Sequence, residues 1–184
     1  MIVFFNLVEK IIKKNVDINI SDENHISPLM FSCKNKNLKN VKILLNHGAN
    51  IEHLDKYNNT ALIIACKSNA LEIFYYLIKN GANVNQMNSY DINPFIAACE
   101  INNFTMIKYI INSVNINHKT MNNKTALIYA YNNSNLKLFK YLIENGADVN
   151  IGEISNEPIL FAACNNNRLE FVKIITKNKV CINY

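Results

Sequence analysis

The sequence predicts an all-α protein with short β-hairpin fingers, built as a solenoid of helix-turn-helix units. A helical template recurs every 32 or 33 residues, a second apolar run follows each copy, and polar stretches of about ten residues separate the units. Periods in this range are typical of solenoids, because one unit cannot bury its apolar face without a neighbour. We therefore expect function to reside on a repeated surface rather than in an enclosed pocket.

The first helix of each unit is predicted from a seven-residue template. Its copies are residues 27–33, 60–66, 93–99, 125–131 and 158–164, and their starts are 33, 33, 32 and 33 residues apart. Four copies open with a serine, threonine or asparagine that can accept hydrogen bonds from free N–H groups at a helix start. These residues are Ser27, Thr60, Asn93 and Thr125. Pro28 and Pro94 follow at the first helical position, where a missing N–H costs nothing.

The second helix is predicted from an apolar stripe that ends at glycine. In one unit the stripe consists of Leu71, Ile73, Phe74, Leu77 and Ile78. This spacing is typical of a helix with one buried face. The terminating glycines are Gly48, Gly81 and Gly146, since a residue that tolerates a positive φ ends a helix cleanly. The unit around Ser113 and Val114 is one residue shorter and lacks this glycine.

The polar stretches between units suit β-hairpin fingers in length and composition. Two residues before the first residue of each template copy stands a histidine, asparagine or aspartate, the types most tolerant of a left-handed backbone after glycine. These residues are His25, Asn58, Asp91, Asn123 and Asn156. We expect them to shape the fingers.

Repeat boundaries follow from this register. We expect a single array over residues 1–184, with a partial N-terminal repeat at 1–20 and full repeats at about 22–54, 55–87, 88–119, 120–152 and 153–184. No apolar stretch approaches the roughly 20 residues needed to span a bilayer, so no membrane segment is expected.

The cysteines indicate the compartment. Cys33, Cys66, Cys99 and Cys164 share one column of the template, and neighbouring repeats stack too far apart for disulfides between them. We expect small buried core residues with free thiols. Free thiols in number favour a reducing compartment, so the cytoplasm is expected, with the nucleus as the alternative.

The residues resemble one family. The pattern Asp55-x-x-Asn58-x-Thr60-Ala61-Leu62-x-x-Ala65, with Asn80-Gly81-Ala82-Asn83-Val84-Asn85, resembles the start and end of an ankyrin repeat. The resemblance covers the whole chain, as five repeats and an N-terminal half. One departure is that the family's first-helix histidine is replaced by Met30, Ile63, Ile96, Ile128 and Phe161. Apolar packing must then substitute for its hydrogen bond.

The resemblance implies a non-enzymatic module that binds a protein partner on a concave face made of finger tips and first helices. Transferred to this chain, the binding residues are Leu54, Lys56, Tyr57, Lys67, Met87, Tyr90, Ile92, Ile101, Met121 and Lys124. Exposed Tyr and Met side chains without a core role are typical of interface hot spots. The alternative is that Leu54, Met87, Ile92 and Ile101 pack finger to finger.

The sequence contains no motif that predicts catalysis or metal binding. No glycine-rich phosphate loop or nucleophile elbow occurs, and His25, His47, His53 and His118 lack metal-ligand spacing. Glu52 and Asp55 lie near His53, but on an open finger we interpret them as solvated polar residues. We expect no enzyme, cofactor, metal or small-molecule substrate.

Charge constrains the partner. The formal net charge is +5, the only arginine is Arg168, and the lysines are spread mostly over second helices. A nucleic-acid binder would concentrate lysine and arginine on one continuous face, so another protein is the expected partner. Two alternatives remain: a substrate-recruiting or targeting arm of a larger polypeptide such as a ubiquitin ligase or effector, and a structural spacer. We expect a monomer unless an uncapped end self-associates.

Overall fold

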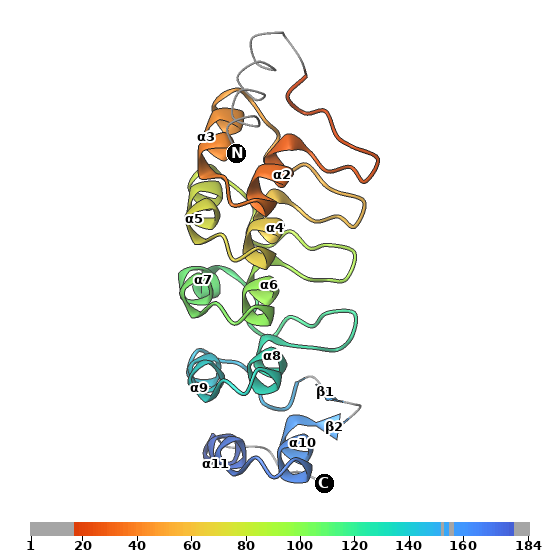
Figure 1. Cartoon of the computed structure of the whole chain (residues 1–184). Coiled ribbons are helices and arrows are strands. Elements are labelled where there is room, and N and C mark those ends of the chain that lie inside the picture. Colours follow the sequence, from red (N-terminus) through yellow and green to blue (C-terminus); the bar gives the residue numbers. More distant parts are fainter. Residues whose placement is uncertain (1–16, 152, 155–156, 179–184) are drawn as a thin grey trace. The chain divides into compact units, whose positions relative to one another are not determined.

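Helices follow one another in pairs along the chain (Figure 1). The computed structural model describes residues 17–151, 153–154 and 157–178, so most of the expected partial repeat at 1–20 lies outside the described residues. First helices are α2 (Pro28–Lys34), α4 (Ala61–Lys67), α6 (Pro94–Glu100), α8 (Ala126–Asn132) and α10 (Ile159–Asn165). Second helices are α3 (Leu38–Asn46), α5 (Leu71–Lys79), α7 (Phe104–Ile110), α9 (Leu136–Glu144) and α11 (Leu169–Lys177). The all-α fold class with helix-turn-helix units is confirmed.

The chain divides into two compact units, Met1–Ser89 and Tyr90–Tyr184. In the first unit α2 packs on α4 and α3 packs on α5. In the second unit α6 packs on α8 and α9 packs on α11. The expectation that residues 1–184 form a single array stays a prediction.

The fingers are turns rather than regular hairpins, with one exception among the described residues. Strands β1 (Glu153–Ile154) and β2 (Glu157–Pro158) pair antiparallel, with Glu153 opposite Pro158. Elsewhere a backbone hydrogen bond closes the finger: Asp22 N–H to Ile26 O (3.2 Å), Asp55 N–H to Asn59 O (3.1 Å) and Thr120 N–H to Lys124 O (3.0 Å). The predicted left-handed residues are confirmed at His25, Asn58, Asp91 and Asn123, with φ of 61°, 59°, 56° and 56°. Asn156 lies outside the described residues.

Three of the four expected caps close the start of a first helix. The Ser27 and Thr60 hydroxyls each accept from a helix N–H at 3.3 Å, and the Asn93 side chain accepts from Ile96 N–H at 2.9 Å. Pro28 and Pro94 stand at the predicted first position. Thr125 is the exception, because its buried hydroxyl has no hydrogen-bond partner among the described residues.

Second helices end as predicted where glycine is present. Gly48, Gly81 and Gly146 have φ of 84°, 90° and 95°. Without the glycine, α7 ends at Ile110 and continues as a short 3₁₀ turn, η1 (Ile111–Ser113). The 3₁₀ turn thus replaces the glycine-terminated end in the shortened unit.

A second set of left-handed residues lies between the paired helices and was not predicted. Its members are Lys36, Asn69, Asn102, Ser134 and Asn167, with φ between 53° and 61°. Lysine and serine carry no strong signal for this conformation, so only the shared register could have indicated the set.

The core repeats in columns along the first helices. Met30, Ile63, Ile96 and Ile128 are buried, which confirms that apolar packing replaces the family's histidine at these positions. Phe161 belongs to the same column but is 44% exposed. Cys33, Cys66 and Cys99 are buried as expected, whereas Cys164 is exposed. Among the described residues no further helix pair follows α10 and α11, so this side of α10 has no neighbour to bury Phe161 and Cys164.

Burial should make the cysteines differ in reactivity. Burial raises the pKa of the Cys33 thiol to about 12 and that of Cys66 further still. Because the thiolate is the nucleophile, we expect iodoacetamide near neutral pH to alkylate Cys164 much faster than Cys33 or Cys66. Peptide mapping by mass spectrometry separates the sites. Equal alkylation rates at Cys33 and Cys164 would contradict the assignment.

The unpaired hydroxyl of Thr125 gives a second prediction. Thr125→Val removes a hydroxyl without a partner, so the free energy of unfolding should change by less than about 0.5 kcal/mol or increase. Thr60→Val is the matched control, because it removes the acceptor of Ile63 N–H and should cost about 1 kcal/mol. Urea denaturation measures both, and an equal loss in the two variants would contradict this account.

Candidate protein-binding surface

Aspartates organise the fingers of the first unit. Asp22 Oδ1 accepts the Ile26 N–H at 2.7 Å. Asp55 Oδ1 accepts the N–H groups of Tyr57 and Asn59, both at 2.8 Å, and Asp55 is buried. The interpretation of Asp55 as a solvated residue was wrong, because its carboxylate is used to shape the finger.

In both units a side chain at the base of a finger binds the turn of the next repeat. Glu52 Oε1 accepts the Asn83 N–H at 2.8 Å, so Glu52 also has a structural contact that the sequence did not indicate. Asn117 occupies the equivalent position in the second unit. Its Oδ1 accepts the Asp148 N–H at 2.8 Å and its Nδ2 donates to Gly146 O at 3.2 Å. These bonds fix the spacing between successive repeats within each unit.

Neighbouring finger tips are joined through their backbones. The bonds are Lys56 N–H to Asn24 O (3.1 Å) and Ser89 N–H to Tyr57 O (2.8 Å) in the first unit, and Met121 N–H to Tyr90 O (3.3 Å) in the second. The backbones of Tyr57 and Tyr90 are therefore held in place, which limits where their side chains can point.

Two histidines add a side-chain bond to this ladder. His53 Nε2 lies 2.9 Å from His25 O, and His118 Nε2 lies 2.7 Å from Asp91 O. His25 and Asp91 are the left-handed residues of the preceding finger. The sequence analysis placed these histidines on turns but missed this contact, which their shared register could have indicated.

Five predicted binding residues belong to the first unit. Tyr57 is 45% exposed, and Leu54 and Met87 are also exposed. The exposed Lys56 donates from Nζ to Asn24 Oδ1, and the same ammonium lies 5.1 Å from the centre of the Tyr57 ring. The finger tip thus presents an aromatic ring next to a fixed positive charge.

A buried amide network positions the fifth residue, Lys67. Its Nζ donates to Asn59 Oδ1 at 3.3 Å, and Asn88 Nδ2 donates to the same oxygen at 2.8 Å. Asn59 Nδ2 in turn donates to Asp55 Oδ2 at 2.9 Å. Lys67 is exposed, yet its ammonium is held by these buried side chains.

The other five predicted residues belong to the second unit. Tyr90 is 48% exposed and Met121 is 65% exposed. Ile92, Ile101 and Lys124 are partly buried. The expectation that these residues and those of the first unit form one contiguous patch stays a prediction.

Two aromatic residues on first helices were missed. Phe31 on α2 is exposed, and Tyr129 occupies the same template position on α8 and is partly buried. The sequence did not mark this template position as a surface position, because two other repeats carry alanine there, Ala97 and Ala162. Both side chains extend the candidate surface from the finger tips onto the helices.

The surroundings of Tyr129 keep its hydroxyl neutral. Burial raises the pKa of Tyr129, and the negative charge of Glu100 raises it further. Lys124 Nζ lies 5.8 Å from the centre of the Tyr129 ring. A neutral phenol beside a carboxylate and an ammonium can both donate and accept hydrogen bonds to a partner.

The described residues form neither a metal site nor a membrane span. Among the described residues, no group of three or more His, Cys, Asp and Glu side chains could hold a metal ion. Within residues 17–151, 153–154 and 157–178, every helix is too short or too polar to cross a bilayer.

Comparison with known proteins identifies related sequences and structures. The family description "Ankyrin repeats (3 copies)" matches residues 1–88 and again residues 86–153. A search of curated proteins found no match. One similar solved structure is described as the predatory endopeptidase Bd0816 from Bdellovibrio bacteriovorus in complex with the immunity protein Bd3460. Its matching chain is 27% identical, with a TM-score of 0.82 over 93% of this chain and 90% of that chain.

The histidine contact between fingers can be tested by exchange. His118→Ala removes the bond to Asp91 O, so the Met121 N–H, which bonds the same preceding finger, should exchange with solvent roughly tenfold faster. His47→Ala is the control, because the His47 ring bonds Ile43 O of its own helix. Hydrogen exchange measures both variants. Unchanged protection of Met121 in His118→Ala would show that the contact contributes nothing to finger rigidity.

Proposed function

The chain belongs to the ankyrin-repeat family, and from this premise we propose that it is a non-enzymatic module that binds one protein partner through finger tips and first helices. The observation that carries the proposal is the pair of half-exposed tyrosines, Tyr57 and Tyr90, on backbones fixed by finger-to-finger hydrogen bonds. We place the module in the cytoplasm.

Rigidity favours binding by these residues. A tyrosine on a mobile loop must be ordered when a partner binds, and the entropy lost reduces affinity. The carbonyls of Tyr57 and Tyr90 already accept hydrogen bonds from the following finger, so the cost of ordering the backbone is met in the free protein. Tyrosine side chains then supply large contact areas at low entropic cost.

The remaining residues have distinct roles in the proposed interface. Met121, whose N–H donates to the Tyr90 carbonyl, supplies apolar contact beside Tyr90, and Ile101 and Tyr129 supply apolar area at the end of α6 and on α8. Lys56 lies next to the Tyr57 ring and Lys124 lies near the Tyr129 ring, and Lys67 adds a third positive charge in the first unit. Charges at an interface rim act mainly on association rate and salt dependence, so we assign them the selection of the partner rather than the main share of affinity.

The similar structure supports a protein as the partner. It pairs an endopeptidase with an immunity protein, so a peptidase is one class of partner to test for this chain. At 27% identity the residues of the two interfaces need not correspond. The proposal therefore rests on the exposed residues of this chain.

The test is capture of a partner followed by substitution of Tyr90. Cross-linking in the native cell supplies the partner, and its dissociation constant is measured by calorimetry. Tyr90→Ala should weaken binding at least about tenfold, because removal of an aromatic anchor typically costs about 2 kcal/mol or more.

The control is Tyr109→Ala in the same unit. Tyr109 lies on the second helix α7 and is 54% exposed, so the substitution removes a comparable ring outside the proposed interface. It should leave affinity within about twofold, and circular dichroism should show both variants folded. Equal weakening by the two substitutions would refute the assignment to finger tips and first helices.

A further inference from the structure

The second helices of the second unit carry a concentration of positive charge. Five exposed lysines lie on α7, α9 and α11: Lys108, Lys137, Lys140, Lys173 and Lys177. The same helices carry two carboxylates, Glu144 and Glu170. Figure 1 shows α7, α9 and α11 in a row on the side opposite the fingers. We call these five lysines the basic outer face.

Both carboxylates are paired along their own helices. Lys140 Nζ lies 3.7 Å from Glu144 Oε1, and Lys173 Nζ lies 2.7 Å from Glu170 Oε1. All four side chains are more than half exposed, and such pairs contribute little free energy, so a partner can displace them. Lys108, Lys137 and Lys177 have no carboxylate partner among the described residues. The face therefore keeps a net positive charge.

An aromatic pair positions two of the lysines that lack a carboxylate partner. The Phe104 and Tyr141 rings meet edge to face, with centroids 5.0 Å apart. Lys137 Nζ lies 5.2 Å from the Phe104 centroid, and Lys108 Nζ lies 5.5 Å from the Phe104 centroid and 5.8 Å from that of Tyr141. Cation–π attraction holds these ammonium groups next to the rings while they stay in solvent.

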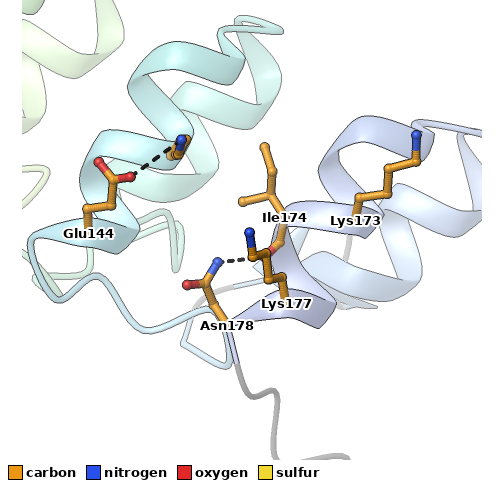
Figure 2. A pocket seen from close by; sticks show the side chains of 6 residues that line it. Glu144, Lys173, Ile174, Lys177 and Asn178 are labelled. Carbon is orange, nitrogen blue, oxygen red and sulfur yellow. Dashed lines mark hydrogen bonds and ion pairs between the residues drawn. The ribbon is translucent and has the colours of Figure 1, made fainter.

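A hollow of about 390 Å³ lies between α9 and α11 on the same face (Figure 2). Its lining residues are Lys140, Glu144, Lys173, Ile174, Lys177 and Asn178. Three ammonium groups with one carboxylate and one isoleucine favour a ligand that combines negative charge with apolar groups.

We propose that the basic outer face binds an acidic, amphipathic segment of a protein, at a site separate from the finger tips. Carboxylates of the segment pair with Lys137 and Lys177, and its apolar side chains enter the hollow beside Ile174. Because the two surfaces lie on opposite sides of the helix pairs, the module can hold two protein segments at once.

Nucleic acid fits this face less well. Arg168 is the only arginine. Its Cζ atom lies 4.3 Å from the centre of the Tyr131 ring and its guanidinium donates to the Tyr131 carbonyl, so it already has partners. Lysines lie close to the Phe104 and Tyr141 rings, which limits their use for stacking bases. Lysine alone supplies charge without the bidentate contacts that arginine makes to phosphate.

The experiment compares two double variants with the same net charge. Lys137→Gln with Lys177→Gln removes two of the three unpaired charges of the basic outer face and leaves Lys108 in place. Lys42→Gln with Lys79→Gln is the matched control in the first unit: Lys42 lies 5.6 Å from the Tyr76 centroid, and Lys79 ends α5 as Lys177 ends α11. The probe is a fluorescent peptide in which Glu alternates with Leu. Fluorescence anisotropy measures its affinity and compares it with the affinities of the glutamine analogue and of a single-stranded oligonucleotide.

The glutamate peptide should bind the parent chain and the glutamine analogue should not. Lys137→Gln with Lys177→Gln should weaken binding roughly tenfold and reduce its salt dependence, whereas the control should stay within about twofold. Equal weakening by both double variants, no binding, or tighter binding of the oligonucleotide with the same lysine dependence would overturn the proposal. Tyr90→Ala should bind the peptide normally, so this test is independent of the proposed function.

Discussion

Every feature of this protein depends on one packing constraint: a helix pair cannot bury its apolar face without the next pair. The column at Met30, Ile63, Ile96 and Ile128 is buried, and Phe161 in the same column is exposed where no described pair follows. The same template position can therefore be buried or exposed, depending on whether a neighbouring helix pair covers it. Neighbouring helix pairs provide the burial. Their regular spacing also brings the fingers within hydrogen-bonding distance of each other.

Regular spacing converts flexible loops into a defined surface. The buried carboxylate of Asp55 shapes its own finger. In the second unit the His118 ring bonds the carbonyl of Asp91 in the preceding finger, and the Met121 N–H donates to the carbonyl of Tyr90. Each bond is worth only about 1 kcal/mol, but together they hold the backbones of Tyr57 and Tyr90 in place. A surface ordered before binding is what a module without a pocket needs for affinity.

The helix pair also separates two kinds of chemistry. The finger side carries half-exposed aromatic residues such as Tyr90, and the second helices of the second unit carry lysines such as Lys137 and Lys177. The lysines fall mostly on second helices in the sequence, and no continuous charged face was predicted from them. The helical period and the stacking of α7, α9 and α11 gather them, because residues about one repeat apart in sequence become neighbours in space.

The sequence alone determined the helices, most of their ends and the left-handed residues of the fingers. Local backbone preferences set these features: glycine ends a helix at Gly81, and Asn58 adopts the left-handed turn. The tertiary structure decided what depends on a neighbouring repeat, including the burial of Asp55 and the exposure of Cys164. Local rules cannot predict such contacts, since the partner atoms belong to residues distant in sequence and meet only when the repeats stack.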